Sequence, residues 1–302
     1  MAFKLLKTEY LKLKGNTSFK VFSIFFLVFL PVIIFTVPAF IEDGMQGESS
    51  YPFLPRDYET TWYFTAYLAS WFSLFILAFI LIFHITNEYA YKTVRQNIID
   101  GYTRADFFKS KFYMLLAIAT IATVYVGVVG FSASFYYQTF SISSGVDLNP
   151  LSMLGGDMPD METVMDQFRA TEMEQLKFED NLWTGSLAIV SYFVQVLAYL
   201  VFAMFVAFFL KKGATSVIVF FGFFLVEKIV GAQLGAENFD AISDHLPLHS
   251  FSEVLPNPSL TDLITGLQSV DTLNSKYVII SLVYIILFML LTRWIFGRRD
   301  VV

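Results

Sequence analysis

The chain of 302 residues contains no cysteine, and only 15% of its residues are charged. Without thiols it can form neither a disulfide nor a thiolate metal site, an absence that is compatible with either side of a membrane. The sequence also has no Gly-x-x-x-x-Gly-Lys-Ser/Thr phosphate loop, no His-Glu-x-x-His and no Gly-x-Ser-x-Gly motif. We therefore expect no nucleotide, catalytic or metal site, and no cofactor, in this chain.

Apolar residues are abundant: they make up 56% of the chain, and 35 residues are Phe. A membrane-spanning helix needs about 20 mostly apolar residues. Six apolar runs are this long: 19–41, 61–86, 112–138, 182–210, 214–234 and 277–296. The composition and these runs predict an all-α polytopic membrane protein with one transmembrane domain. The first run is too long for the apolar core of a cleaved signal peptide.

The charges alternate along the segments between these runs. If the N-terminus is cytoplasmic, the inside segments hold 15 of the 20 Lys and Arg but only 5 of the 26 Asp and Glu. Cations near span ends set orientation. We expect both termini in the cytoplasm, in a bacterial cytoplasmic (inner) membrane, with extracytoplasmic segments at 139–181 and 235–276. The inside segments are 1–20, 87–111, 211–213 and 292–302.

Residues 1–18 have the pattern of an interfacial amphipathic helix. Apolar side chains recur at helical spacing on one face, while lysines occupy another. Such a helix can lie in the cytoplasmic interface; the alternative is a simple basic flank of the first span. Gly15 to Ser18 breaks the helix and offers an N-cap for that span. The apolar face is Phe3, Leu6, Tyr10 and Leu13, and the lysines are Lys4, Lys7, Lys12 and Lys14.

The connection at 87–111 is more structured than a simple link. Tyr91, Val94 and Ile98 form a short apolar ridge, and Gly101 is placed to end their helix. Thr103 can cap a second helix, whose first turn contains Asp106. We therefore predict a helix, a break and another helix at the cytoplasmic surface.

This layout resembles the ABC type-2 permeases, the membrane halves of ATP-binding-cassette exporters. That family has six spans, an amphipathic helix before the first, and a coupling segment between the second and third. The sequence of its coupling segment commonly begins with Glu, three residues and a Gly-Thr pair. An Arg, a Gly, a small hydroxyl residue next to Arg, and a Lys that enters the third span follow in that order. Lys92 replaces the usual Gly of the Gly-Thr pair. The matching residues here are Glu88, Thr93, Arg95, Gly101, Thr103, Arg104 and Lys109 or Lys111.

The resemblance implies that the segment docks a separate ABC ATPase, which would bind the ATP and Mg²⁺. It also implies a second permease copy or a paralogue, with the pathway between the two. The alternative is that Glu88, Arg95 and Arg104 form a local set of ion pairs that caps the two spans, a common and weak arrangement. The expected docking residues are Glu88, Tyr91, Thr93, Val94, Arg95, Ile98, Gly101 and Arg104.

Ionisable side chains inside spans are rare and often functional. Glu227 and Lys228 lie about 20 Å along the fifth apolar run. Either the span ends there, at the outer interface, or the pair lines a transport pathway. Gln195, within the fourth run, is a further candidate for a residue that lines such a pathway. His84 and Gln195 can also simply bond a neighbouring helix.

The acidic outer segments offer weaker signals. A helix from about Pro159 to Lys177 would carry an apolar stripe at Met158, Met161, Met165 and Phe168. The stripe fits packing better than partner contact or Cu(I) binding. Asp244, His245 and His249 have metal-ligand spacing, but Pro247 interrupts them, and we favour a surface pair without metal. Prolines in 235–275 predict short interfacial helices.

The most consistent interpretation is the permease subunit of an ATP-driven exporter, working as a dimer in the lipid bilayer with two ATPase subunits. Nucleic acid is not an expected partner. An ion-coupled secondary transporter would predict internal repeats and helices broken at mid-membrane, and neither is clear here. A third interpretation is a non-transporting membrane anchor or immunity protein.

Overall fold

The computed structural model describes residues 2–44, 58–99, 101–145, 161–236, 243–255 and 275–298. Every regular element in these ranges is helical. Six helical segments are long and apolar enough to cross a membrane, which confirms a polytopic all-α membrane protein. The elements are α1 (Ala2–Gly15), α2 (Thr17–Gly44), α3 (Tyr58–Phe72), η1 (Ser73–Leu77), α4 (Ala78–Ala90), α5 (Thr93–Ile99), α6 (Arg104–Gly145), α7 (Met161–Leu210), α8 (Gly213–Ala236), α10 (Pro247–Ser252) and α12 (Ser275–Arg298).

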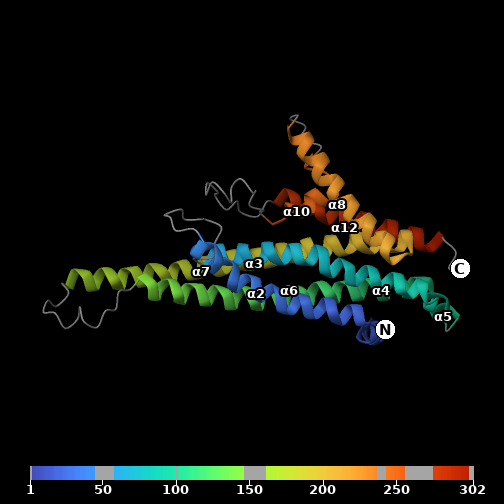
Figure 1. The fold of residues 1–302 in the computed structure, drawn as a ribbon, viewed down its shortest axis with the longest axis horizontal. Helices are drawn as coiled ribbons and strands as arrows, with labels where there is room; N and C mark the ends of the chain where they lie inside the picture. Colours follow the sequence, from blue (N-terminus) through green and yellow to red (C-terminus); the bar gives the residue numbers. More distant parts are fainter. Residues whose placement is uncertain are drawn as a thin grey trace.

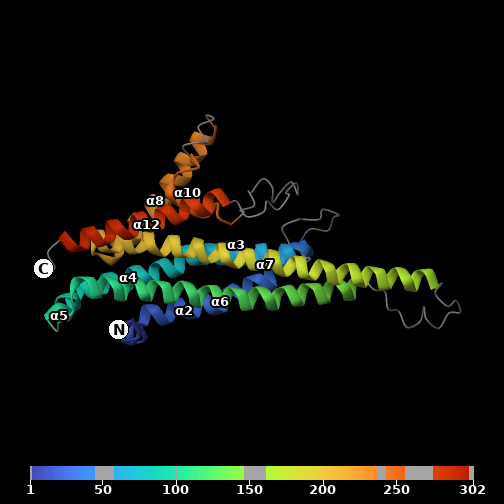
Figure 2. The same cartoon turned by 180° about the vertical axis from the view of Figure 1, so that it is seen from behind.

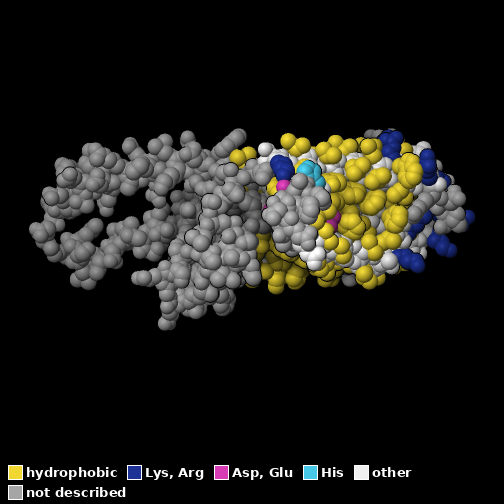
Figure 3. All heavy atoms as spheres, turned by 90° about the horizontal axis from the view of Figure 1, so that it is seen from above, with side chains coloured by type: hydrophobic (Ala, Val, Ile, Leu, Met, Phe, Trp, Pro, Cys, Tyr) yellow, Lys and Arg dark blue, Asp and Glu magenta, His cyan; other side chains and the backbone are white. Residues whose placement is uncertain are grey.

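The spans form an elongated bundle, from which α8 diverges (Figures 1 and 2). The helix α1, the short helix α5 and the C-terminal end of α12 lie at one end, called here the basic end. Figure 3 shows that Lys and Arg side chains gather at this end, next to a band of apolar side chains. The cations of the predicted inside segments are therefore also close together in space.

The second and fourth spans form the centre of the bundle. Of the most apolar window in each, 67% is buried, against 17% in the first and sixth spans and 22% in the fifth. The second span consists of α3, one π-helical turn (η1) and α4. At that turn the Ser73 hydroxyl lies 2.5 Å from the Tyr192 hydroxyl of α7, which pairs two buried polar groups. The three outer spans leave wide apolar faces uncovered.

Trp62 of α3 fits against two glycines where α3 meets α6 and α7. A Cβ added to Gly130 would lie 2.5 Å from the Trp62 ring, and one added to Gly185 would lie 2.6 Å from it. Small residues allow such close approach between membrane helices. This contact places α3 between the two longest helices of the bundle.

The helices that contain the third and fourth spans are longer than these predicted spans. The span expected at 112–138 lies within α6, which runs from Arg104 to Gly145, and the helix expected at 159–177 is continuous with the fourth span in α7. No proline interrupts either helix. The expected outer segment 139–181 is therefore helical at both ends, and the methionine side chains in it lie outside the described residues.

The N-terminal helix is confirmed as α1, and its break is as predicted. The Asn16 side-chain oxygen accepts a hydrogen bond from the Ser18 backbone N–H at 2.9 Å, which caps α2. Leu13 is fully buried and Leu6 partly so, whereas Tyr10 is 54% exposed. One face of α1 thus packs on the bundle, and its contacts create the site described next.

Candidate functional site

The segment predicted to dock an ATPase forms the short helix α5 between two tight turns. Lys92 enters it with a φ of 56°, and the Thr93 hydroxyl donates a hydrogen bond to the Glu88 carbonyl at 3.2 Å. Gly101 leaves it with a φ of 97°. Thr103 then caps α6, because its hydroxyl accepts the Asp106 backbone N–H at 3.1 Å. The predicted helix, break and helix are present, and the second helix is the start of the third span itself.

Two of the three residues of the apolar ridge, Val94 and Ile98, face the bundle and not an open docking surface. Val94 is only 2% exposed and belongs to the hydrophobic core, and Ile98 is half-buried. The exposed residues of α5 and the turn before it include Tyr91, at 77% exposure, Arg95, and Ile99, at 73%. A buried valine side chain makes more van der Waals contacts than an exposed one. Val94 therefore stabilises the packing of α5 on its own chain.

Glu88 is likewise turned inward rather than available for docking. It is 6% exposed, and its carboxylate oxygens lie 2.8 Å from the Lys12 ammonium of α1 and 2.7 Å from the Lys111 ammonium of α6. These ion pairs join α4 to two helices from other parts of the chain. The alternative of a local ion-pair set with Arg95 and Arg104 therefore does not describe Glu88, because its ion-pair partners Lys12 and Lys111 come from distant parts of the chain.

Glu9 of α1 completes this group. One of its oxygens lies 2.5 Å from the Lys111 ammonium and 2.7 Å from His84 Nε2, and the other accepts a hydrogen bond from Ser110 at 3.2 Å. Lys12 approaches the same carboxylate at 3.3 Å. We call this set the ionic junction; it consists of Glu9, Lys12, His84, Glu88, Ser110 and Lys111.

Glu9 and Lys12 keep their charges in the ionic junction because each has oppositely charged partners. Burial alone raises the pKa of the Glu9 carboxyl, but the hydrogen bond with His84 and the charges of Lys111, His84 and Lys12 together lower that pKa well below its ordinary value. Burial lowers the pKa of Lys12, yet Glu88 and Glu9 reverse this, and the net shift is upward. The carboxylate and the ammonium thus both remain ionised at neutral pH.

Three members of the junction could in principle ligate a metal. Ligand atoms of Glu9, His84 and Glu88 all lie within 4.8 Å of one another. However, the Lys111 ammonium lies within ion-pair distance of both carboxylates and 3.3 Å from His84 Nε2. A divalent ion would have to displace this fully buried cation, so the arrangement fits an internal salt bridge rather than a metal centre.

The residues considered for a pathway converge on the short helix α10. The Glu227 carboxylate accepts the backbone N–H groups of Leu248 at 2.7 Å and His249 at 3.1 Å, which caps the start of α10. Lys228 donates to the Ser252 hydroxyl at 3.0 Å. Gln195 Nε2 lies 3.5 Å from the Ser252 carbonyl. Each of these side chains therefore bonds to a neighbouring element, and together they fix α10 against the fourth and fifth spans.

The segment before α10 is tied to the sixth span. Asp244 forms an ion pair with Lys276 at 2.6 Å and accepts a hydrogen bond from the Tyr277 hydroxyl at 3.0 Å. The bond from Lys276 holds the pKa of the Asp244 carboxyl below its ordinary value. The pKa of His249 is also lowered, chiefly by burial. His245 precedes α10 while His249 lies within it, so one helix does not present both imidazoles.

Glu9 is the member of the ionic junction that the sequence interpretation overlooked. It lies between Leu6 and Leu13 on the apolar face of α1, at spacings of three and four residues. A lone carboxylate on the face that packs inward needs a buried cation. That spacing was the signal available in the sequence, whereas Lys111 as its partner depends on the fold.

Comparison with known proteins places the chain in a family without assigning it an activity. A search of curated proteins finds no match. Residues 33–302, most of the chain, match a family model that begins near the end of the first span and covers the other five spans, the α4 and α6 residues of the ionic junction, and α10. The chain therefore belongs to the family DUF2705, described as a protein of unknown function.

Proposed function

We propose that the chain is the membrane permease subunit of an ATP-driven exporter, in which α5 contacts a separate ATPase. The proposal rests on one observation above all: a short surface helix is fixed beside a buried ionic junction that joins three helices. The resemblance of the 87–111 segment to the coupling segment of ABC type-2 permeases supports it. The six spans are consistent with this role.

The position of α5 would let it transmit force. Glu88 lies at the end of α4, one short turn before α5, and the Thr93 hydroxyl bonds back to its carbonyl. Because Glu88 also pairs with Lys12 and Lys111, a push on α5 reaches α1 and α6 as well as α4. Charge-assisted pairs in a buried setting are stiff connections. Such a junction would turn motion of a bound ATPase into motion of the spans.

The proposed contact surface consists of the exposed residues Tyr91, Arg95 and Ile99. Two large apolar side chains beside a guanidinium match the anchors that protein interfaces favour. A helix seated in a groove of its partner is a common mode of recognition. In this proposal Val94 and Ile98 support the surface from beneath and do not themselves contact the ATPase.

The same proposal needs further partners. The ATPase would supply ATP and Mg²⁺ binding, and a second permease copy or a paralogue would complete the pathway. The uncovered apolar faces of the first, fifth and sixth spans leave room both for lipid and for such a copy. The basic end would lie in the cytoplasm of a bacterial inner membrane, because most of the Lys and Arg are there.

Co-purification with an ATPase encoded beside this chain tests the proposal. Ile99→Asp places a charge in the proposed groove, and Arg95→Glu reverses one at its edge; both should abolish recovery of the ATPase while the permease still inserts. Lys14→Glu, an exposed charge reversal on α1, should leave recovery unchanged. Unchanged recovery with both α5 variants would refute docking through α5. Val94→Asp is not suitable, because burying its charge would disrupt the core.

A further inference from the structure

The basic end contains a pocket lined by cations from two spans. Its walls come from the first turns of α6 and the last turns of α12, and its volume is about 350 Å³. Arg104, Lys109 and Arg293 line it, all three are exposed, and no carboxylate is among the lining residues. Among the described residues, no acid forms an ion pair with Lys109 or Arg293. The pocket therefore offers an anion an excess of positive charge.

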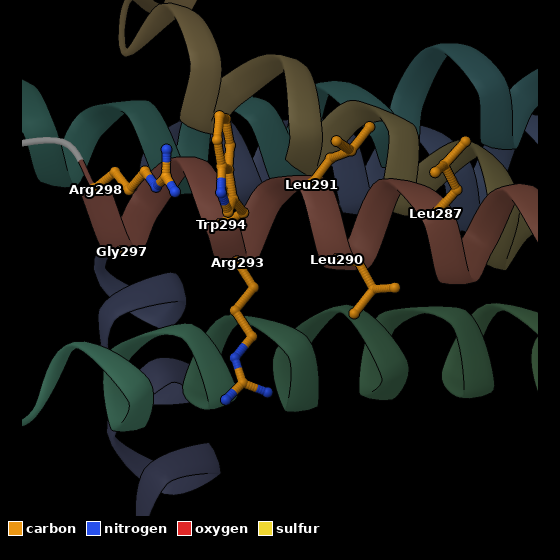
Figure 4. Close-up of a pocket in the computed structure, with 7 residues that line it drawn as sticks. All are labelled: Leu287, Leu290, Leu291, Arg293, Trp294, Gly297 and Arg298. Atoms are coloured by element: carbon orange, nitrogen blue, oxygen red, sulfur yellow. The ribbon is translucent and has the colours of Figure 1, made fainter.

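The geometry of this pocket is fixed by contacts between the two helices. Arg104 Nη1 donates a hydrogen bond to the Gly297 carbonyl at 2.9 Å, which holds the guanidinium beside the end of α12. Figure 4 shows that the Arg293 side chain extends from α12 toward α6. The nearest acid in the first turn of α6, Asp106, is bonded to Thr103 at 2.6 Å and does not line the pocket. Cations from both helices thus face a common space.

An apolar groove continues from this pocket along α12. The groove has a volume of about 670 Å³ and shares Arg293 and Gly297 with the cationic pocket. Leu287, Leu290 and Trp294 line it, with 44%, 60% and 55% exposure. Arg298 covers the Trp294 ring at 4.5 Å. The two cavities therefore form one site with an apolar part and a charged end.

The dimensions of the combined site match one lipid leaflet. From Leu287 to Arg298 the helix rises about 16 Å, and half of the hydrocarbon core is about 15 Å. Tryptophan is typical of the membrane interface, so Trp294 marks the level at which acyl chains give way to headgroups. Basic pockets between spans are known recognition sites for acidic lipid headgroups.

We propose that this site binds an anionic phospholipid. The phosphate would lie between Arg293, Lys109 and Arg104, and one acyl chain would follow Leu290, which lies on the same side of α12 as Arg293 (Figure 4). Guanidinium groups suit this task because their planar array of N–H donors matches phosphate oxygens. This inference goes beyond transport and does not depend on docking of an ATPase.

Lipid binding to the purified full chain in a non-ionic detergent tests the proposal. Native mass spectrometry would measure the affinity for phosphatidylglycerol and for phosphatidylcholine with identical acyl chains. We expect the anionic lipid to bind more tightly. The double variant Lys109→Gln with Arg293→Gln should lose about tenfold or more of that preference. Because both side chains are exposed, the variant should retain its fold, which its elution volume checks.

The control removes the same charge elsewhere at the basic end. Lys14→Gln with Lys212→Gln changes two exposed lysines outside the pocket and should keep the preference for the anionic lipid. An equal loss in both double variants would overturn the proposal in favour of general surface charge, and so would equal affinity for the two lipids. Glycerol phosphate should compete poorly; full competition would indicate a free-anion site. A shift of the pocket variant from dimer to monomer would show that a second copy covers this face.

Discussion

The carboxylate of Glu9 attaches α1 to the rest of the molecule. Glu9 is 2% exposed and contacts His84 from the second span, and Lys111 and Ser110 from the third. Burial of a charge is costly unless it is paired and hydrogen-bonded. Here the pairing is dense, so the cost of desolvation is offset only while every member is present. The junction is therefore expected to be sensitive to single substitutions.

Replacing Glu9 by Gln should destabilise the chain strongly. Among the described residues, the change leaves the fully buried Lys111 with Glu88 as its only anionic partner, at a cost on the order of 3 kcal/mol. The measurement is thermal unfolding of purified protein in detergent. Glu253→Gln, which alters a partly exposed carboxylate beside α10, should change the unfolding temperature little. Equal unfolding temperatures for wild type and Glu9→Gln would contradict the role of the junction.

The pH dependence of the same group is a separate prediction. The pKa of Glu9 is lowered in the folded chain, so its contribution to stability is complete above the ordinary carboxyl pKa of 4.5. That contribution is lost as pH falls below this value and through the folded pKa. Between pH 6 and 8 the Glu9 contribution should thus be constant, and acid unfolding should be less steep in Glu9→Gln. Unfolding scans at a series of pH values measure the difference.

Lys92 is a second residue whose conformation is informative. Its φ of 56° lies in the left-handed region, which glycine adopts without a steric penalty. ABC type-2 permeases commonly have Gly at the matching position, so the backbone turn can be the same although the residue differs. Lys92→Gly should leave α5 in place and stabilise the chain by up to about 1 kcal/mol. Lys92→Val should destabilise it, because a β-branched residue fits this region poorly; unfolding scans of the two variants compare them.

At the scale of the elements, the sequence predicts where the helices lie better than it predicts which parts of the molecule they contact. Apolar runs identify all six spans because each run is as long as the membrane requires. Thr103 and Gly101 predict the break before α6, since capping and positive φ depend only on local residues. The inward direction of Val94 was not predictable in this way, because α5 is short and its ridge could pack on its own chain or on a partner.

The position of the short helix α10 depends on Glu227, a charged side chain of the fifth span. Glu227 accepts two backbone N–H groups at its start, and charged hydrogen bonds of this kind contribute about 1.5–3 kcal/mol each. Since the chain has no cysteine, Ser250→Cys introduces a single thiol at a fully buried position of α10. We expect that thiol to resist a water-soluble maleimide, and to react readily once Glu227→Ala is added. Glu253→Ala is the control, and it should leave the thiol protected.

At the scale of the whole molecule, the charge asymmetry of the sequence corresponds to a real end of the bundle. Lys and Arg gather at the basic end (Figure 3). The pair Asp244 and Lys276 lies near α10, since Lys276 is at the opposite, N-terminal end of the sixth span. Counting charges between apolar runs was enough to predict this. The count could not reveal that Glu9 and Glu88 are buried among the cations, because their partners come from distant parts of the chain.

Orientation in the membrane follows from the same asymmetry and can be measured directly. Cations resist translocation, so the end that carries Lys212 should be cytoplasmic and the end that carries Ser275 should face outward. Both residues are exposed, and a cysteine at either one is the only thiol in the chain. In intact cells an impermeant maleimide should label Ser275→Cys, and it should label Lys212→Cys only after the membrane is opened. The reverse pattern would place α5 outside the cell, where no ATPase could reach it, and would exclude the exporter proposal while leaving the helical bundle and its ionic junction intact.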